Sequence, residues 1–264
     1  MASTSALFVS NEIETQPECW ETAAACAPAA AEALPRPGEE VAVIGCGTSW
    51  FVAMAYAALR EDAGQGRTDA FTASEFPPSR RYDRVIAITR SGTTTEVVQA
   101  LEALPAPHQT TAIVGVLDTP AARAGGATID LSFADERSVV QTRFATSALA
   151  LLRAHLGQDL TAAVEDARDA IAEPLDPAWL EADHIAFLGR GWTIGLAQEA
   201  ALKAREASLS FTEAHPAMDY RHGPIALAQP GRLVWMFGEA PPNLADQVRL
   251  TGATWIDSPI DPMA

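Results

Sequence analysis

A hydroxyl-rich segment of the chain has the composition of a phosphate-binding loop. Five of the seven residues from Thr89 to Thr95 are serine or threonine. The segment follows an apolar run, Arg84–Ile88, and precedes a helical pattern. Capping a helix uses one hydroxyl and leaves the others without a role. Because several donors must converge on the oxygens of a phosphate, hydroxyls beside a helix start predict a phosphate site here.

A glycine-rich loop, Gly45–Ser49, follows another apolar run. A dinucleotide-binding fingerprint needs a third Gly or Ala where Trp50 stands, and a nucleotide P-loop needs a Gly-Lys-Ser/Thr triplet that the chain lacks. The loop instead offers close backbone approach at Gly47 and the hydroxyls of Thr48 and Ser49, next to a helix start that favours an anion. It is either a tight turn or part of the same phosphate site.

A charged helical segment carries groups that are able to move protons. Glu199, Lys203 and Glu206 are four and three residues apart, so they share one helix face. They form either a solvated ion-pair stripe or a carboxylate poised beside an ammonium for proton transfer. His222, which directly precedes a Gly-Pro turn, is either structural or catalytic.

Short apolar runs alternate with helical patterns, as in α/β proteins whose parallel sheets are covered on both faces. The expected strands are Val41–Ile44, Arg84–Ile88, Thr111–Leu117, Ala127–Leu131, Ile185–Leu188, Arg232–Phe237 and Ala253–Asp257. The expected helices are Trp50–Arg60, a pattern ending at Leu104, Thr142–Leu156, a pattern ending at Ile171, and Leu196–Ser208.

Two strand–Gly-x-Gly–helix openings, at Gly45 and Gly189, indicate an internal duplication. We therefore expect an α/β fold of two doubly wound lobes with parallel sheets flanked by helices. An amphipathic helix is expected to begin near Asn11 and to end before Pro35. The expected domains are an N-terminal helical segment, a first lobe with the phosphate site and a second lobe, over 1–37, 38–173 and 174–264.

Composition excludes several classes of protein. Acidic residues outnumber basic ones by 34 to 18, which argues against nucleic acid as a partner. The chain is 48% hydrophobic and 20% charged, unlike a disordered protein. No apolar run approaches the ~20 residues of a membrane-spanning helix. The three cysteines lack metal-ligand spacing, so we expect reduced thiols, no metal site and a cytoplasmic location.

Together these motifs resemble those of the SIS (sugar isomerase) family. Gly45–Ser49 and Ile88–Thr94 are similar to the signature loops of its first domain. Gly189–Gly191, the Glu199–Glu206 helix and His222–Leu227 resemble its second domain. The match follows the family's order along essentially the whole chain. The tandem-domain members that it resembles include the isomerase region of glucosamine-6-phosphate synthase and free-standing phosphosugar isomerases and deaminases.

The resemblance implies two SIS domains, a sugar-phosphate substrate, no cofactor and a homodimer that shares its active sites. It implies that Glu206 moves a proton between C1 and C2 and that His222, reaching in from the partner subunit, opens the sugar ring. Lys203 matches an active-site lysine. The residues implied to bind the substrate or its phosphate are Gly47, Thr48, Ser49, Thr89, Arg90, Ser91, Thr94, Val139, Gln141 and Glu199.

The sequence departs from the family pattern in places. The synthase has a serine where Gln141 stands, which changes one expected sugar contact. No nucleophilic cysteine follows Met1, so we expect no glutaminase domain. Relatives continue past the second lobe with a helix and a basic tail that closes over the sugar, whereas this sequence reaches Ala264 soon after the lobe's third strand. Either the sequence is truncated or the protein lacks this lid, and a site without a lid excludes water less well.

Three functions are compatible with these features. The first is an enzyme that isomerises an aldose, ketose or amino-sugar phosphate by proton transfer between C1 and C2. The second is a deaminase or deglycase that acts on an amino-linked sugar phosphate, which shares the enolisation step but breaks a C–N bond. The third is a sugar-phosphate-binding module without catalysis, which the missing tail favours.

Overall fold

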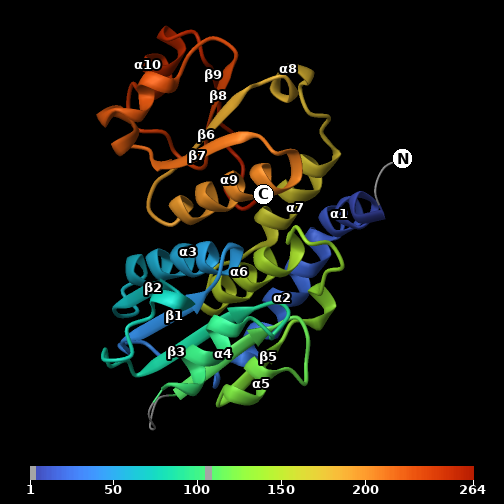
Figure 1. The fold of residues 1–264 in the computed structure, drawn as a ribbon, viewed down its shortest axis with the longest axis vertical. Helices are drawn as coiled ribbons and strands as arrows, with labels where there is room; N and C mark the ends of the chain where they lie inside the picture. Colours follow the sequence, from blue (N-terminus) through green and yellow to red (C-terminus); the bar gives the residue numbers. More distant parts are fainter. Residues whose placement is uncertain (1–3, 105–108) are drawn as a thin grey trace.

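The computed structural model describes residues 4–104 and 109–264, which form two parallel β-sheets, each with helices on its faces (Figure 1). All neighbouring strands of the first sheet run parallel. In spatial order its strands are β2 (Thr68–Thr72), β1 (Val41–Gly45), β3 (Arg84–Thr89), β4 (Gln109–Val114) and β5 (Ala127–Asp130).

The second sheet is also parallel throughout. In spatial order its strands are β7 (Phe211–Pro216), β6 (His184–Gly189), β8 (Arg232–Met236) and β9 (Thr254–Ile256). Every residue of β1 and β3 is buried, which explains why these strands are uniformly apolar in sequence.

Helices cover both faces of the first sheet. One face packs against α2 (Gln16–Ala30), α3 (Thr48–Asp62) and α6 (Arg143–His155). The other packs against α4 (Thr95–Glu102) and α5 (Pro120–Ala124). The short 3₁₀ helices η1 (Ala73–Glu75) and η2 (Ser132–Ala134) follow β2 and β5.

The second sheet packs against α9 (Thr193–Ser208) on one face and α10 (Leu244–Leu250) on the other. The remaining elements are α1 (Thr4–Glu14), α7 (Thr161–Ala172), α8 (Pro177–Leu180), η3 (Asp219–His222) and η4 (Pro224–Leu227). In Figure 1 α7 and α8 carry the chain from the first lobe to the second.

The strands and helices differ from the sequence prediction at several places. The predicted strands are present, although β4 ends at Val114 instead of Leu117. β2 and β7 were not predicted, because both are edge strands whose residues are mostly half-exposed and mix polar with apolar side chains. The predicted start of the N-terminal helix near Asn11 is wrong. α1 begins at Thr4 and α2 begins at Gln16, while residues 1–3 of that segment lie outside the described residues.

The four strands of the second sheet follow the same order as the first four of the first sheet, which adds β5 at its edge. Both first strands also end in a glycine that meets the following helix. A Cβ on Gly45 would lie 2.7 Å from Ser49, and a Cβ on Gly189 would lie 2.2 Å from Thr193. Only glycine fits at these two positions. A common origin of the two lobes stays a prediction.

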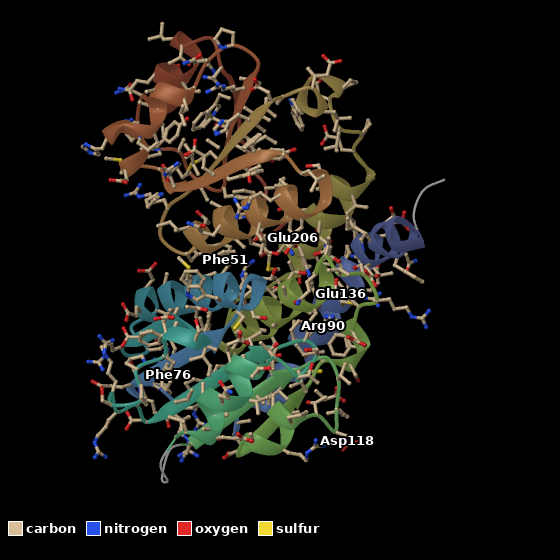
Figure 2. All side chains as sticks on the ribbon, in the orientation of Figure 1. Phe51, Phe76, Arg90, Asp118, Glu136 and Glu206 are labelled. Carbon is tan, nitrogen blue, oxygen red and sulfur yellow. The ribbon has the colours of Figure 1, made fainter. Side chains whose placement is uncertain are left out.

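The lobes meet where α9 crosses α3. A Cβ on Gly195 would lie 2.4 Å from the carbonyl oxygen of Phe51, so the two helix backbones approach as closely as glycine permits. Phe51 is labelled on α3, below α9, in Figure 2. The two helices run in opposite senses, because Leu202 further along α9 lies beside Gly47 at the start of α3. The second half of α9 therefore reaches the loop that follows β1.

A second connection joins the lobes near the C-terminal end of the described chain. Arg153 of α6 donates two hydrogen bonds to the carboxylate of Asp261, at 2.8 and 2.6 Å. Its guanidinium also lies 5.0 Å from the ring centre of Trp192, next to α9. The backbone N–H of Asp261 donates to Asp166 of α7 at 2.7 Å. The segment that follows β9 is thereby fastened to two helices of the first lobe.

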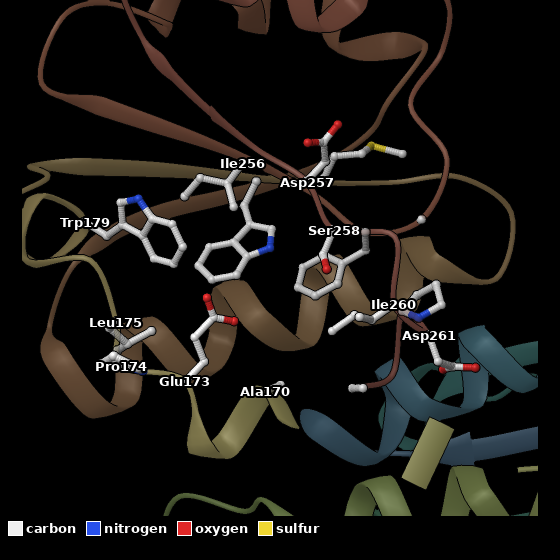
Figure 3. Close-up of a pocket in the computed structure, with 16 residues that line it drawn as sticks. Ala170, Glu173, Pro174, Leu175, Trp179, Ile256, Asp257, Ser258, Ile260 and Asp261 are labelled. Atoms are coloured by element: carbon white, nitrogen blue, oxygen red, sulfur yellow. The ribbon is translucent and has the colours of Figure 1, made fainter. Parts of the chain in front are cut away.

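A cavity lies on the α9 side of the second sheet (Figure 3). Trp235 of β8 contributes an aromatic wall, with Trp179 of α8 packed edge-on against it at 5.3 Å between ring centres. Ile256 of β9, Glu173 and Asp261 complete much of the lining. None of the sequence-predicted site residues lines this cavity, so it is separate from the candidate site.

Candidate functional site

The hydroxyl-rich loop after β3 is not used to cap the following helix. Thr94 is the N-cap residue of α4, yet its side chain makes no capping hydrogen bond. Its Oγ1 lies 3.3 Å from Oγ1 of Thr89 instead. Oγ of Ser91 accepts hydrogen bonds from the backbone N–H and the hydroxyl of Thr93, at 3.3 and 3.0 Å. Helix capping therefore does not account for the hydroxyls of Thr94 and Ser91.

The loop after β1 lies next to this one, because β1 and β3 are adjacent parallel strands whose carboxyl ends meet at the same edge. Gly47 has a φ of 54° and precedes the first turn of α3. Thr48 and Ser49 follow in that turn and are buried. The two predicted loops thus share one edge of the first sheet, as a single phosphate site requires.

Arg90 ties the β3 loop to the segment before α6. Its Nη1 donates to the carbonyl oxygen of Glu136 at 2.6 Å and to Oδ1 of Asp135 at 3.2 Å. Arg90 Nε is buried without a hydrogen-bond partner in the described part of the chain. These contacts connect the loop after β3 to the segment before α6. Its contact with a phosphate stays a prediction.

The segment before α6 carries the predicted sugar contacts. Val139 is 87% exposed, whereas the side-chain oxygen of Gln141 is buried without a partner among the described residues. Glu136 fixes the start of α6, because its carboxylate accepts hydrogen bonds from the backbone N–H groups of Thr142, Arg143 and Phe144. The sequence analysis did not single out Glu136. A carboxylate six residues before a helix pattern is too common a feature to be recognised without the fold.

The charged residues of α9 form one cluster over the first lobe. Nζ of Lys203 lies 2.6 Å from Oε2 of Glu206 and 3.7 Å from Oε1 of Glu199. Glu206 is exposed and is labelled at the boundary between the lobes in Figure 2. The spacing in sequence correctly predicted a shared helix face.

Glu199 is the least exposed of the three side chains, at 15% against 22% for Lys203 and 37% for Glu206. Burial raises the pKa of its carboxyl to about 7, although Lys203 and the hydroxyl of Thr48 act in the opposite direction. Its Oε2 is buried and has no hydrogen-bond partner within the part of the chain that the structure describes. A carboxyl that titrates near neutral pH is suited to accept and return a proton.

The stability of the protein is expected to fall as the pH rises through the pKa of Glu199. Because folding raises this pKa from 4.5 to about 7, the folded state binds more protons than the unfolded chain between these values. The stabilising contribution is present below the unfolded pKa and is lost as the pH rises past the folded one, a change of about 3 kcal/mol.

Urea unfolding of the wild type and of Glu199→Gln, from about pH 5 to about pH 8, measures this contribution. The variant should gain stability over the wild type as the pH rises. Glu165→Gln, the same change at an exposed position of α7, serves as the control. A pH-independent difference between wild type and Glu199→Gln would contradict the raised pKa.

His222 is the one proposed catalytic residue that the structure does not place in contact with the others. It ends η3, is exposed, and makes no hydrogen bond or ion pair within residues 4–104 and 109–264. The structure thus brings the α9 cluster to the loop after β1, where Glu199 meets Thr48 and Leu202 meets Gly47, and leaves His222 on the surface of the second lobe.

No helix within the described ranges is long and apolar enough to span a membrane. The same residues contain no group of three or more His, Cys, Asp or Glu arranged to hold a metal ion. Cys19, Cys26 and Cys46 are free thiols.

Two parallel sheets flanked by helices, with a charged helix of the second lobe packed at the loop after β1, define an α/β protein with an SIS-like fold. The chain matches no family model. Its curated relatives include the glutamine–fructose-6-phosphate aminotransferases (isomerizing) of Gloeobacter violaceus, 29% identical over 84% of this chain and 43% of the relative, and of Caulobacter vibrioides, 30% identical over 83% and 42%. The chain spans less than half the length of these relatives.

Solved structures resemble the whole described fold. Glucosamine-6-phosphate deaminase from Thermotoga maritima has a TM-score of 0.75 at 26% identity, covering 96% of this chain and 84% of that one. Tagatose-6-phosphate ketose/aldose isomerase from Escherichia coli has a TM-score of 0.75 at 19% identity, covering 94% and 78%. The second likeness concerns the fold alone.

Proposed function

We propose that this protein is an enzyme that binds a phosphosugar and moves a proton between its C1 and C2 carbons. The observation that carries the proposal is the position of the charged cluster on α9, where Glu199 meets the hydroxyl of Thr48 at the start of α3. The β1 loop there shares the carboxyl edge of the first sheet with the hydroxyl-rich β3 loop. The names of two relatives support the proposal, because they describe an isomerising aminotransferase and a deaminase that act on phosphosugars.

In the proposed site, the phosphate binds at the carboxyl edge of the first sheet. Its oxygens accept hydrogen bonds from the loop hydroxyls and from the free N–H groups at the helix starts. The residues assigned to phosphate are Gly47, Thr48, Ser49, Thr89, Arg90, Ser91 and Thr94. Val139 and Gln141 contact the sugar. This site belongs to the proposed first domain, 38–173, and the acid–base helix to a duplicated second domain, 174–264.

In the proposed reaction, the carboxylate of Glu206 removes a proton from one of the two carbons and returns it to the other. Lys203, whose ammonium is 2.6 Å from Glu206, stabilises the negative charge that develops on the enediol oxygens. Glu199, with a pKa of about 7, exchanges the proton that must move between the two sugar oxygens. These steps need no cofactor.

A second candidate is a deaminase, favoured by the 26% identity to the Thermotoga maritima glucosamine-6-phosphate deaminase over 96% of this chain. It uses the same proton transfer on an amino sugar, after which water adds to the resulting imine carbon, the C–N bond breaks and ammonia leaves. A thermal-shift screen of fructose 6-phosphate, glucose 6-phosphate and glucosamine 6-phosphate tests for binding, since a ligand at about 100 times its Kd adds about 2.7 kcal/mol of stability.

Bound sugars are then tested for solvent-deuterium incorporation at C1 or C2 and for ammonia release. Exchange without ammonia supports the isomerase, and exchange with ammonia supports the deaminase. Binding without exchange identifies a binding module. The absence of any binding overturns the proposal.

We also propose that the protein is a cytoplasmic homodimer in which His222 of one subunit opens the sugar ring in the other. The exposure of His222, away from the α9 cluster's contacts, supports this arrangement. Exposed apolar side chains on the same lobe, Leu209 at 87% and Phe211 at 81%, supply surface for such an interface.

Sedimentation velocity at assay concentration is expected to give a dimer. Replacing Leu209 and Phe211 by serine should shift it toward the monomer and reduce turnover of cyclic sugars. A wild-type protein that sediments as an active monomer would contradict the shared site.

A further inference from the structure

α1 is attached to the rest of the protein in an unusual way. Among its described side chains, residues 8–14, the only buried one is Glu12, which is 3% exposed. No α1 residue belongs to the hydrophobic clusters of the described core. In Figure 1 the helix lies at the periphery of the molecule. The one buried side chain by which α1 meets the rest of the protein is thus a carboxylate and not an apolar group.

The carboxylate of Glu12 binds the segment that carries Val139 and Gln141. Its Oε1 accepts hydrogen bonds from the backbone N–H groups of Arg137, at 2.6 Å, and Ser138, at 3.3 Å. The hydroxyl of Ser138 also donates to its Oε2. Two consecutive backbone N–H groups that converge on one oxygen restrain the backbone of both residues. Glu12 therefore fixes the conformation of the loop from a position 125 residues earlier in the chain.

The charge of Glu12 is not needed for an ion pair. Of the two arginines on the same segment, Arg137 lies over the ring of Phe8 at 5.5 Å, and Arg143 donates to Thr15 and to the carbonyl of Asp135. No salt bridge among the described residues includes Glu12. What Glu12 supplies is a pair of acceptor oxygens.

The contact decides which side chains of the loop face outward. Ser138, held by Glu12, is 2% exposed, and its hydroxyl also lies 2.7 Å from the carbonyl oxygen of Val140. The next residue, Val139, is 87% exposed. Without its hydrogen bonds to Glu12, Ser138 would no longer be restrained in its buried position, and Val139 would no longer be restrained in its exposed one.

We propose that Glu12 is a positioning residue, which holds the 137–141 loop so that Val139 and Gln141 face the sugar. This inference rests on the proposed function. It assigns to α1 a role in substrate affinity, while the chemistry on α9 stays independent of it, because none of the Glu12 contacts involves that helix.

The experiment compares Glu12→Ala, Glu12→Gln and Glu14→Ala. Glu14 is exposed on the same helix, so its replacement removes the same charge without the loop contact. Glu12→Gln keeps an acceptor for the two N–H groups, and its amide can donate to Ser138, whose hydroxyl then donates to Val140. The readouts are KM and kcat for fructose 6-phosphate or glucosamine 6-phosphate, and hydrogen exchange of the 137 and 138 amides.

Glu12→Ala is expected to raise KM about tenfold, the change for each 1.4 kcal/mol of lost binding, with kcat within about twofold of the wild type. Exchange of the two amides should accelerate, while Glu12→Gln and Glu14→Ala remain close to the wild type. An unchanged KM in Glu12→Ala overturns the proposal. A fall in kcat and in melting temperature that Glu12→Gln does not rescue also overturns it, since it indicates a general structural role.

A wild-type protein that binds neither sugar overturns the proposed function instead, and the substrate role of Glu12 with it. The amide exchange distinguishes the two failures, because it reports on the loop without any substrate.

Discussion

Glu206→Gln is expected to abolish most of the solvent-deuterium incorporation at C1 or C2 of a bound phosphosugar, while leaving its affinity nearly unchanged. The substitution keeps the size of the side chain and a hydrogen-bonding group near Lys203, but it removes the base. Loss of a general base lowers rates by about 10²–10⁴-fold. Mass spectrometry of the sugar after incubation in heavy water measures the rate, and calorimetric titration measures the affinity.

Two further variants separate the base from its surroundings. Glu165→Gln, an exposed carboxylate on α7, should exchange at the wild-type rate. His222→Asn should spare exchange on the open-chain sugar more than the reaction of the cyclic form, because ring opening precedes enolisation. If Glu206→Gln exchanges at the wild-type rate, its contact with Lys203 is a structural ion pair and the base lies elsewhere.

The double variant Ser91→Ala with Thr94→Ala is expected to weaken phosphosugar binding at least about tenfold. Each hydroxyl that donates to a charged oxygen contributes about 1.5–3 kcal/mol. The oxygen of Ser91 already accepts two hydrogen bonds from Thr93, so its own O–H proton remains available to a ligand. Titration with fructose 6-phosphate measures the change.

The fold should tolerate this double variant, since neither side chain caps α4. Thr95→Ala, which removes an exposed hydroxyl from the first residue of α4, is the matched control and should bind normally. Equal affinity of the wild type and the double variant would place the phosphate outside the first lobe.

The sequence predicted the buried strands well and the edge strands poorly. β1 and β3 are buried along their whole length, and a short uniformly apolar run identifies such a strand. β7 has Thr, Glu and His among its six residues and lies at a sheet edge, so its pattern does not differ from that of a loop. Its pairing with β6 is a tertiary effect that local sequence does not report.

The candidate site shows the same division. The hydroxyl loop and the Glu199–Glu206 face are local features of sequence, and both were recognised from spacing. The raised pKa of Glu199 was not, because it arises where α9 packs on α3, and that contact depends on Gly195 meeting a backbone from the other lobe. The hydrogen bond between Glu12 and Ser138 joins residues more than a hundred positions apart, so it too could not be predicted without the three-dimensional fold.

The bidentate contact between Arg153 and Asp261 has a mechanical consequence. Domains joined by a single linker can close on a ligand by rotating about that linker as a hinge. Here two connections join the second lobe to the first. The chain enters the second lobe from α7, and Asp261, which follows β9, is hydrogen-bonded to residues of α6 and α7. Such a rotation of the second lobe would have to break the largely buried ion pair between Arg153 and Asp261. These contacts oppose a swing of one lobe against the other, so we expect the lobes to keep their relative position when a sugar binds.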